Sequence, residues 1–446
     1  MSSRKFEKVC RELIRPISPT SNHLRCFQFS LLDQMTRPTS VHFALFYPPP
    51  PTTTPCGGDQ SYSYEQARAV NSSRLLVLKK SLCETLASFY PFAGRIKDNS
   101  IECNDDGVPF YEAFAHKYRL KDLLRQPHVD IQILPTVDDQ EGSIVHIPLL
   151  VQVTLFECGG ITIGIRASHK IADLSTLCTL INAWAVTARG SPNCVDVPEF
   201  VAAAKFLPHP IPHVSPDSSN MIELFKPFLD NQRVTKIFVF DASTIVSLKS
   251  KVDWSFVPTP TRVEVVSATI WKCFMIASAC TRTSSYLMYN VNIRKRLVPP
   301  LPNHCVGNVV ATTTTCKGEN DGSDLATLVT CIRKGLSDLI LKYVDKSRQY
   351  EAILAIPRDS IKLGIEFLEK KIQLFINSWC VYQFYEVDFG WGKPSWVSPV
   401  EQPIKNLILL LDSRDGGIDA YVCLSEKEMA AFEHELVDLL AIGSAK

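Results

Sequence analysis

A histidine four residues before an aspartate can act beside that carboxylate, and this spacing recurs along the sequence. One such pair is His169 and Asp173, and another is His434 and Asp438. His169 ends an apolar, strand-like run and precedes a helical pattern, whereas the second pair lies inside an amphipathic helix pattern and should face solvent. Polar groups at strand ends often serve in catalysis, so we expect His169 to carry chemistry. The alternative is structural, with Asp173 as a helix cap and His169 as a buried histidine.

A histidine at this place suits the removal of a proton from a hydroxyl group that attacks an acyl carbon. Its ordinary pKa of about 6.5 lets the neutral ring accept a proton near neutral pH, and such general-base help is worth about 10²–10⁴ in rate. The sequence contains no Gly-x-Ser-x-Gly motif, no glycine-rich nucleotide motif and no His-Glu-x-x-His motif. We therefore expect direct transfer, in which the oxygen of the acceptor itself attacks.

A second unusual segment begins with Asn377-Ser-Trp-Cys380 and continues to Asp388-Phe-Gly-Trp-Gly392. Two aromatic residues among glycines, followed by Pro394, predict a tightly packed loop. Asp388 could act as an acid or a base if it faced a cleft. The alternative is a rigid turn that holds a domain together.

The elements that must position these residues recur in both halves of the chain. Residues 151–156 and 161–167 read as two strands joined by a turn, with a helix after them; residues 404–411 and 418–424 repeat this order. In the second half, Ser425 and Glu428 form a capping box at the start of the helix. Hairpins followed by helices predict α/β layers with mixed sheets.

A proline-rich stretch near the middle of the chain predicts a boundary between two domains, because such a density of proline excludes helices and central strands. We expect an N-terminal domain over 1–206, a linker over 207–230 and a C-terminal domain over 231–446. A ligand site between two such domains would be an ordinary arrangement.

The composition indicates a globular protein of 446 residues with 46% hydrophobic residues and a net charge of +1. This charge balance disfavours a nucleic-acid partner. The 15 cysteines show no Cys-x-x-Cys or zinc spacing, so we expect reduced thiols and no metal. Neither a secretory signal nor a membrane-spanning stretch is visible, which predicts a cytoplasmic protein without a membrane partner.

Taken together, these motifs are similar to those of the BAHD acyltransferases of plant specialised metabolism. The resemblance covers nearly the whole chain. It rests on the His169 and Asp388 motifs and on further matching segments, which are Leu32-Asp-Gln34, Tyr90-Pro-Phe-Ala-Gly-Arg95, Cys103 to Pro109, Asn292-x-Arg294 and Gly307-Asn308. Residues 12–19 and Ser378-Trp-Cys380 resemble the branch of alkaloid acetyltransferases.

The resemblance implies two chloramphenicol-acetyltransferase-like domains with a channel between them, and a monomer that takes acyl-CoA as co-substrate with no permanently bound cofactor. It implies His169 as general base and a structural role for Asp388. Asp173 is implied to point away from the channel and to pair with Arg294. Ser378 and Trp379 match positions near the acyl oxygen, where they could steady an oxyanion, and Asn308 matches a position for binding the co-substrate.

The function expected from these arguments is an acetyl-CoA-dependent O-acetyltransferase that acts on a hydroxyl of a plant alkaloid. A terpenoid alcohol as acceptor, or a malonyl or longer acyl donor, is the alternative among enzymes. A binding protein that kept the fold and lost catalysis is the alternative outside them, and the presence of His169 argues against it.

Overall fold

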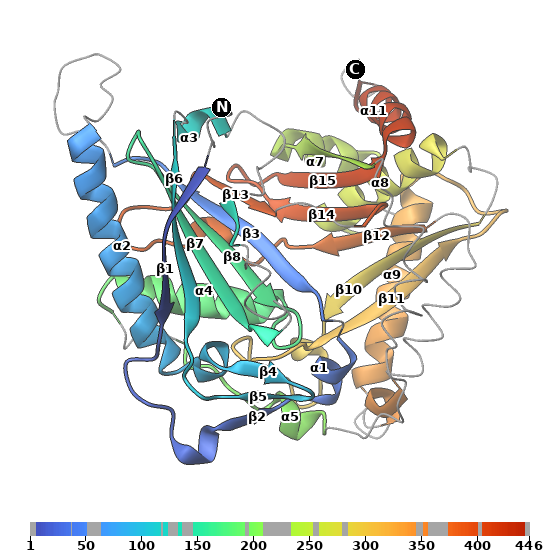
Figure 1. Ribbon diagram of the computed structural model, residues 1–446. Helices are drawn as coiled ribbons and strands as arrows, with labels where there is room; N and C mark the ends of the chain where they lie inside the picture. Colours follow the sequence, from blue (N-terminus) through green and yellow to red (C-terminus); the bar gives the residue numbers. More distant parts are fainter. Residues whose placement is uncertain are drawn as a thin grey trace. The chain divides into compact units, whose positions relative to one another are not determined.

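The structure is a computed structural model that describes most of the chain (Figure 1). The described residues are 6–36, 38–50, 64–116, 119–123, 133–135, 146–191, 196–207, 233–252, 258–278, 284–344, 351–355, 373–399 and 404–441. From residue 208 on, the expected linker lies outside them. Among the described residues, no helix is long and apolar enough to cross a membrane.

The chain divides into two compact units, each made of three separate segments. The first unit comprises Met1–His209, Pro302–Val309 and Tyr382–Glu401. The second unit comprises Pro210–Leu301, Val310–Val381 and Gln402–Lys446. These units differ from the contiguous domains expected from the sequence, because two short segments of the C-terminal half belong to the first unit. The second of these segments carries Asp388, whose motif was expected in the C-terminal domain.

A six-stranded mixed sheet forms the centre of the first unit. Its strands, in spatial order, are β1 (Phe6–Ile14), β6 (Val108–Ala115), β7 (Leu149–Phe156), β8 (Ile161–Ser168), β3 (Ser40–Tyr47) and β13 (Trp396–Pro399). Strands β6 and β7 run parallel, and the other neighbours are antiparallel. The pairing of β13 with β3, in which Trp396 lies opposite Phe46, explains why the chain around Asp388 belongs to this unit.

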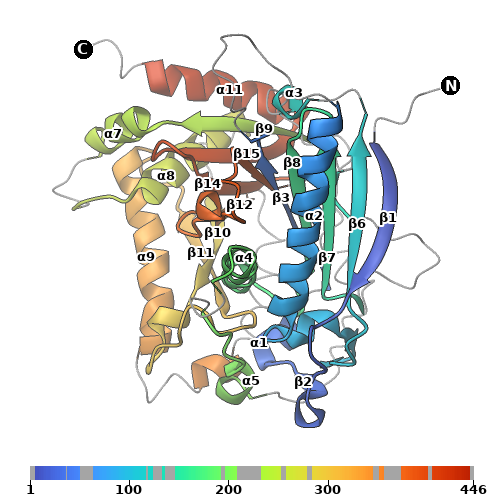
Figure 2. The same cartoon turned by 90° about the vertical axis from the view of Figure 1, so that its left-hand side faces the viewer.

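The remaining elements of the first unit are short strands and helices. A three-stranded sheet contains β2 (Cys26–Gln28), β5 (Ser100–Glu102) and β4 (Arg95–Lys97). The helices are α1 (Leu31–Met35), α2 (Tyr64–Leu86), α3 (Leu120–Leu123), α4 (Leu174–Ala188) and α5 (Ala202–Lys205), with 3₁₀ turns η1 (Asn22–Leu24), η2 (Tyr90–Ala93) and η9 (Phe384–Glu386). Helix α2 packs against β1, β7 and α4 (Figure 2). The buried Trp184 of α4 donates a hydrogen bond from its indole to the carbonyl of Leu78 in α2.

The second unit contains another six-stranded mixed sheet with helices packed on it. The strands, in spatial order, are β11 (Val310–Lys317), β10 (Ser285–Asn292), β12 (Gln373–Ser378), β14 (Leu407–Asp412), β15 (Ile418–Ser425) and β9 (Arg233–Phe240). The helices are α7 (Ala242–Ser250), α8 (Arg262–Ala277), α9 (Leu325–Val344) and α11 (Glu426–Ala441), with the 3₁₀ turn η8 (Arg294–Arg296). Helix α8 contacts α7, α9 and α11 as well as β12 and β15.

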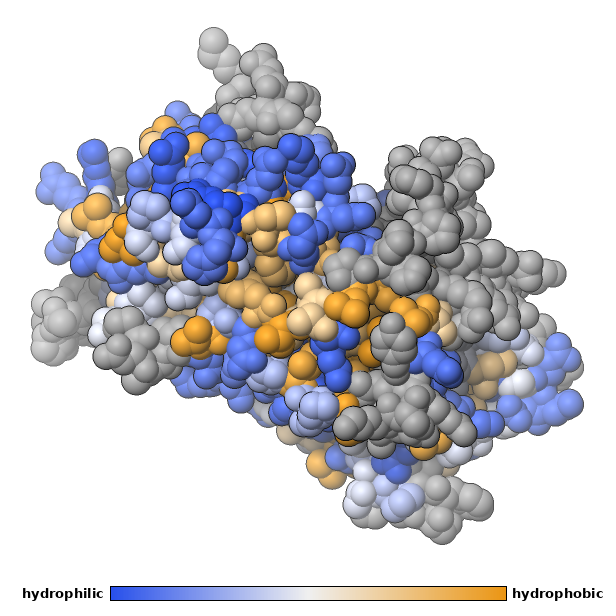
Figure 3. Space-filling model, turned by 90° about the horizontal axis from the view of Figure 1, so that it is seen from below, coloured by the Kyte–Doolittle hydropathy of each residue, from blue (hydrophilic) through white to orange (hydrophobic). Residues whose placement is uncertain are grey.

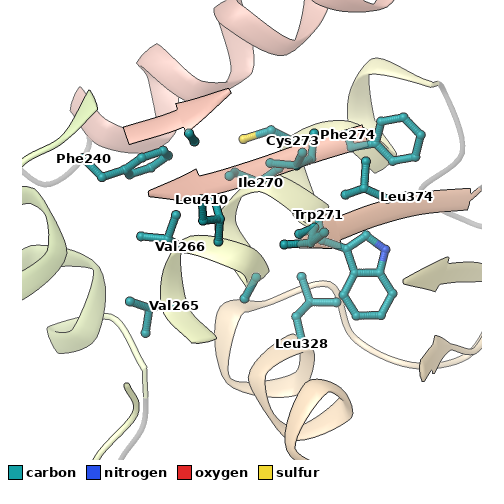
Figure 4. Packing of buried hydrophobic residues seen from close by; sticks show 14 of the residues in the cluster. Phe240, Val265, Val266, Ile270, Trp271, Cys273, Phe274, Leu328, Leu374 and Leu410 are labelled. Atoms are coloured by element: carbon teal, nitrogen blue, oxygen red, sulfur yellow. The ribbon is translucent and has the colours of Figure 1, made fainter. Parts of the chain in front are cut away.

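The core of the second unit forms where α8 meets the sheet. Trp271, Phe274 and Leu410 are among its buried side chains, and they interdigitate with aliphatic residues from α9 and β12 (Figure 4). Trp271 satisfies its indole N–H by donating to the hydroxyl of Ser285, 2.8 Å away. Burial of this much apolar surface is the main force that holds the helices on the sheet.

The two repeated units of strand, turn, strand and helix are confirmed. Strands β7 and β8 form an antiparallel hairpin followed by α4, and β14 and β15 form one followed by α11. The capping box at the start of α11 is present, because the amide of Glu428 donates to the hydroxyl of Ser425 and the Glu428 carboxylate accepts from the amide of Ser425.

The surface is mixed in character. On the face shown in Figure 3, hydrophilic residues cover much of the view and hydrophobic ones gather toward its middle. The cysteines that the structure describes are not joined in disulfides, and three of them, Cys10, Cys26 and Cys316, are exposed and do not belong to the core.

Candidate active site

His169 lies in the short connection between β8 and α4, within the first unit. Strand β8 ends at Ser168, and α4 begins after its N-cap residue, Asp173. The backbone amide of His169 donates to the carbonyl of Thr39, 2.8 Å away, which ties the connection to the chain that enters β3. Ser168 before the half-buried histidine and Ile171 and Ala172 after it are buried, so the connection is anchored on both sides of His169.

The imidazole of His169 contacts the side-chain amide of Asn308. Its Nδ1 atom lies 3.2 Å from Oδ1 of Asn308. The Nδ2 atom of Asn308 lies 2.9 Å from Oδ1 of Asp33 and 2.6 Å from the carbonyl oxygen of His169. A carboxylate and a carbonyl only accept hydrogen bonds, so the NH₂ group must face them. Oδ1 of Asn308 then accepts from Nδ1–H of His169, and the lone pair of the neutral ring lies on Nε2.

The surroundings of His169 favour its neutral form. Burial lowers the pKa of His169 below the ordinary 6.5, because it penalises the charged ring. The hydrogen bond to Asn308 and the negative charge of Asp173 act in the opposite direction without cancelling the effect. A neutral ring with its lone pair on Nε2 can take a proton from a hydroxyl group.

The buried carboxylate of Asp33 contacts Asn308, the partner of His169. Its Oδ1 accepts from the backbone amide of Asn308 at 2.7 Å as well as from Nδ2. Its Oδ2 accepts from the amide of Ser30 at 3.0 Å and from the Ser30 hydroxyl at 2.6 Å. Burial raises the pKa of Asp33, and these hydrogen bonds oppose that shift. The carboxylate therefore has donors on both oxygens.

Sequence reasoning named Asp33 only as part of a matching segment and gave it no role. A local signal was present, because Ser30 and Asp33 have the spacing of a capping box, and they form one at the start of α1. The contact with Asn308, 275 residues along the chain, has no such signal.

Asp173 connects the start of α4 with the segment that carries Asn308. Its Oδ1 accepts from the amide of Thr176 at 2.9 Å, which is the N-cap contact, and its Oδ2 accepts from the amide of Val309 at 3.0 Å. The helix-cap role considered for Asp173 is therefore present. Nearby, the hydroxyl of Thr176 and the backbone of Gly307 exchange two hydrogen bonds, of 3.0 and 3.1 Å.

Arg294, the expected partner of Asp173, belongs to the second unit and is fully buried there. Its backbone amide and its Nη1 atom donate to Oδ1 of Asn292, at 3.1 and 3.3 Å. The ion pair between Asp173 and Arg294 stays a prediction.

Ser378 and Trp379 also belong to the second unit, at the end of β12. Both are half-buried, and the backbone amide of Trp379 donates to the carbonyl of Leu410. Their placement near an acyl oxygen stays a prediction. So does the binding of the co-substrate by Asn308, whose observed contacts are with His169 and Asp33.

Asp388 stabilises its own turn. Its Oδ1 accepts from the amides of Gly390 at 2.7 Å and Gly392 at 2.9 Å, and its carbonyl accepts from the guanidinium of Arg189. Gly390 and Gly392 have φ values of 108° and 99°, a region that residues with side chains rarely adopt. These contacts agree with the rigid turn proposed from the sequence.

Phe389 fixes this turn to the body of the first unit. Its buried ring lies edge-on to Trp184 of α4, with centroids 5.0 Å apart, and edge-on to Tyr47 of β3 at 5.9 Å. The hydroxyl of Tyr47 donates to the carbonyl of Val387, 3.0 Å away. Trp391 stacks on Phe389 and lies under the guanidinium of Arg74. The loop therefore packs on the unit that carries His169.

His434 and Asp438 form an exposed pair on α11. The two groups are 3.3 Å apart with side-chain exposures of 74% and 58%, as expected for an i, i+4 pair on a solvated helix face. Within the described ranges, no group of three or more His, Cys, Asp or Glu residues could hold a metal ion.

Comparison with known proteins gives one consistent result over the length of the chain. A family model described as the Transferase family matches residues 4–439. The chain is 36% identical to akuammiline synthase 1 of Alstonia scholaris over 459 residues, covering 99% of each chain. It is 34% identical to limonoid 1-O-acetyltransferase of Citrus sinensis over 455 residues, covering 97% of each.

The fold is also that of a solved structure. The crystal structure of vinorine synthase matches with a TM-score of 0.78 at 32% identity, over 97% of this chain and 98% of that chain. This match confirms the expected class, an α/β fold of the chloramphenicol-acetyltransferase type with mixed sheets flanked by helices.

Proposed function

The chain belongs to the BAHD family of acyltransferases, and on this premise we propose that it transfers the acetyl group of acetyl-CoA to a hydroxyl group of a plant alkaloid. The observation that carries the proposal is the contact of Nδ1 of His169 with Oδ1 of Asn308, from which the tautomer of the ring follows. With Nδ1–H bound by Asn308, the ring has its lone pair on Nε2 and is held neutral by burial. A base prepared in this way is what direct attack by a hydroxyl requires.

The proposed reaction needs no covalent enzyme intermediate. Nε2 of His169 takes the proton of the acceptor hydroxyl while its oxygen attacks the thioester carbonyl carbon. As the tetrahedral intermediate collapses, the carbon–sulfur bond breaks, and the leaving thiolate takes the proton from the imidazolium. The products are an ester and CoA, and His169 returns to its neutral form. Ser378 and Trp379 remain our proposed donors to the oxyanion, a contribution typically worth about 3–4 kcal/mol per donor.

The proposed acyl donor and the proposed acceptor alcohol are supported by different relatives. The acetyl donor is supported by similarity to a limonoid 1-O-acetyltransferase. The alkaloid acceptor is supported by similarity to akuammiline synthase 1 and vinorine synthase and by the segments that resemble the alkaloid branch. The same limonoid enzyme supports the alternative, a terpenoid alcohol as acceptor.

Acyl transfer by the purified chain tests the proposal directly. The chain would be incubated with acetyl-CoA and panels of hydroxylated alkaloids and limonoid alcohols, and the esters would be detected by mass spectrometry. This readout is preferable to a thiol reagent, because exposed Cys10, Cys26 and Cys316 would also react. Malonyl-CoA and a longer acyl-CoA would replace acetyl-CoA in parallel reactions.

We expect an acetyl ester of an alkaloid alcohol, and we expect His169→Ala to lower its rate by about 10² or more. The matched control is His434→Ala, which alters an exposed histidine with the same spacing to an aspartate and should keep the wild-type rate. Esters of limonoid alcohols alone would favour the terpenoid alternative. No ester from any donor and acceptor, with acyl-CoA still bound, would favour the inactive binding protein.

A further inference from the structure

The buried carboxylate of Asp33 is connected to the proposed base, His169, through a single residue, Asn308. It contacts Asn308 through two hydrogen bonds to the same oxygen, at 2.7 Å from the backbone amide and 2.9 Å from Nδ2. Asn308 in turn contacts His169 at Nδ1. Asp33 and Asn308 are both buried, so water competes little for these contacts.

The orientation of the Asn308 amide decides which nitrogen of His169 is basic. In the observed orientation Oδ1 faces Nδ1, which therefore carries the proton. In the flipped orientation the NH₂ group would face Nδ1, so Nδ1 would hold the lone pair and Nε2 the proton. A ring in that second form cannot accept a proton at Nε2.

Asp33 opposes the flipped orientation. A flip would place the Asn308 carbonyl oxygen against Oδ1 of Asp33, where two acceptors would face each other in a buried site. The backbone carbonyl of His169 also accepts from Nδ2 of Asn308 and therefore also opposes the flip. It belongs, however, to the same residue as the ring that is being positioned. Asp33 also holds the backbone of Asn308, so it determines both the place and the orientation of the amide.

Asp33 is itself held in position. Ser30 donates to Oδ2 through its amide and its hydroxyl, and the Ser30 hydroxyl accepts from the amide of Asp33. Lys170, the residue after His169, donates to the carbonyl of Gln34 at 2.9 Å, which links α1 to the connection that carries His169. Both donations from Ser30 go to Oδ2 of Asp33, the oxygen that Asn308 does not use.

We propose that Asp33 is a positioning residue that sets the tautomer of His169 by orienting the side-chain amide of Asn308. The inference rests on the proposed function for its catalytic consequence, since it takes His169 as the base. Its structural part, the tautomer, does not depend on turnover.

The test measures the tautomer and the kinetics separately. Protein labelled with ¹⁵N-histidine would be studied by NMR at alkaline pH, where imidazoles are neutral, and the His169 signals would be assigned from their loss in His169→Gln. The variants are Asp33→Ala, Asp33→Asn and Asn308→Ala. The matched control is Asp241→Ala, which removes the N-cap aspartate of α7 and leaves both bonds between Asp33 and Asn308 in place.

We expect His169 to be protonated at Nδ1 in the wild type and in Asp241→Ala, and to populate both tautomers in Asp33→Ala and Asn308→Ala. The kcat of Asp33→Ala should fall by about tenfold or more, within the ~10²–10⁴ that a general base supplies, while the KM for acyl-CoA stays within about twofold. Asp33→Asn keeps the shape and an acceptor oxygen, so it should fold and retain more of the Nδ1–H form than Asp33→Ala.

Two results would overturn the inference. One is a fully Nδ1-protonated His169 in both Asp33→Ala and Asp33→Asn. The other is a kcat loss in Asp241→Ala equal to that in Asp33→Ala at the same fall in melting temperature, which would make the effect one of stability alone. An inactive wild type with the expected tautomers would contradict the proposed function and leave the positioning role of Asp33 supported.

Discussion

The carboxylate of Asp173 accepts a hydrogen bond from the backbone amide of Val309, with 3.0 Å between Oδ2 and the nitrogen. Its other oxygen caps α4. One side chain therefore holds the start of the helix after His169 and the residue next to Asn308. The two groups that define the proposed base, the imidazole and the amide, are kept together through this aspartate.

We expect Asp173→Ala to lower both stability and activity. Loss of the N-cap contact costs about 1 kcal/mol of unfolding free energy, and an unsatisfied buried amide at Val309 costs about 1–3 kcal/mol more. Urea denaturation would measure the loss, and turnover should fall with it because Asn308 moves away from the ring. Unchanged stability would contradict the role seen here.

The same variant tests the ion pair predicted with Arg294. If Asp173 pairs with that buried guanidinium, removing one partner costs about 3–5 kcal/mol, and the double variant Asp173→Ala/Arg294→Met should be less destabilised than the sum of the single variants. Additive losses in this double-mutant cycle would rule the pair out.

The pH dependence of kcat/KM should report the lowered pKa of His169. The base works only when it is neutral, so activity falls as the pH drops through its pKa. Since burial lowers that pKa below 6.5, the midpoint of the acid limb should lie below 6.5. The profile would be measured with an acceptor alcohol that does not itself titrate.

A variant of Asp173 provides the control for this profile. Its negative charge raises the pKa of His169, so Asp173→Asn should move the acid limb to still lower pH. A wild-type midpoint above 6.5, or a shift upward in the variant, would contradict this account of the site.

Features of the fold and the site that arise between neighbouring residues could be predicted from the sequence, whereas contacts between residues far apart in the chain could not. The β7–β8 hairpin, α4 and the capping box of α11 follow from local patterns, and His169 was found because it ends a strand. The contacts of Asn308 with His169 and Asp33 span 139 and 275 residues, and no local pattern encodes them. The pairing of β13 with β3 joins residues that are even farther apart in the chain, such as Trp396 and Phe46, which is why the domains expected from the sequence were contiguous.

Because of His42, the free energy of unfolding should decrease as the pH is lowered from 6.5 to about 4. His42 lies on β3 opposite Arg166 of β8, and burial, followed by the charge of Arg166, lowers its pKa to about 4. Its Nε2 is buried and has no hydrogen-bond partner in the described structure. Below pH 6.5 the unfolded chain takes up a proton that the folded chain refuses until about pH 4, so unfolding is favoured in that window.

Urea denaturation at several pH values would measure this effect in the wild type and in His42→Gln. The variant cannot titrate at this position, so its stability should fall less steeply from pH 6.5 to 4, although His169 contributes a change of the same sign. His434→Gln, at an exposed position, is the control. An unchanged slope in His42→Gln would contradict the lowered pKa, because it would mean that His42 takes up its proton at the same pH in the folded and the unfolded chain.

Two substitutions distinguish a structural role of Asp388 in its turn from a direct role in the reaction. Its Oδ1 accepts from the amides of Gly390 and Gly392, whose backbone angles depend on the turn. Asp388→Ala removes this acceptor, so the melting temperature and the activity should fall together as Phe389 loses its anchored position against Tyr47 and Trp184. Asp388→Asn keeps an oxygen acceptor for both amides and should keep most of the stability and most of the turnover. If Asp388→Asn instead had the wild-type melting temperature and acyl-CoA affinity but no turnover, the carboxylate would take part in the reaction itself.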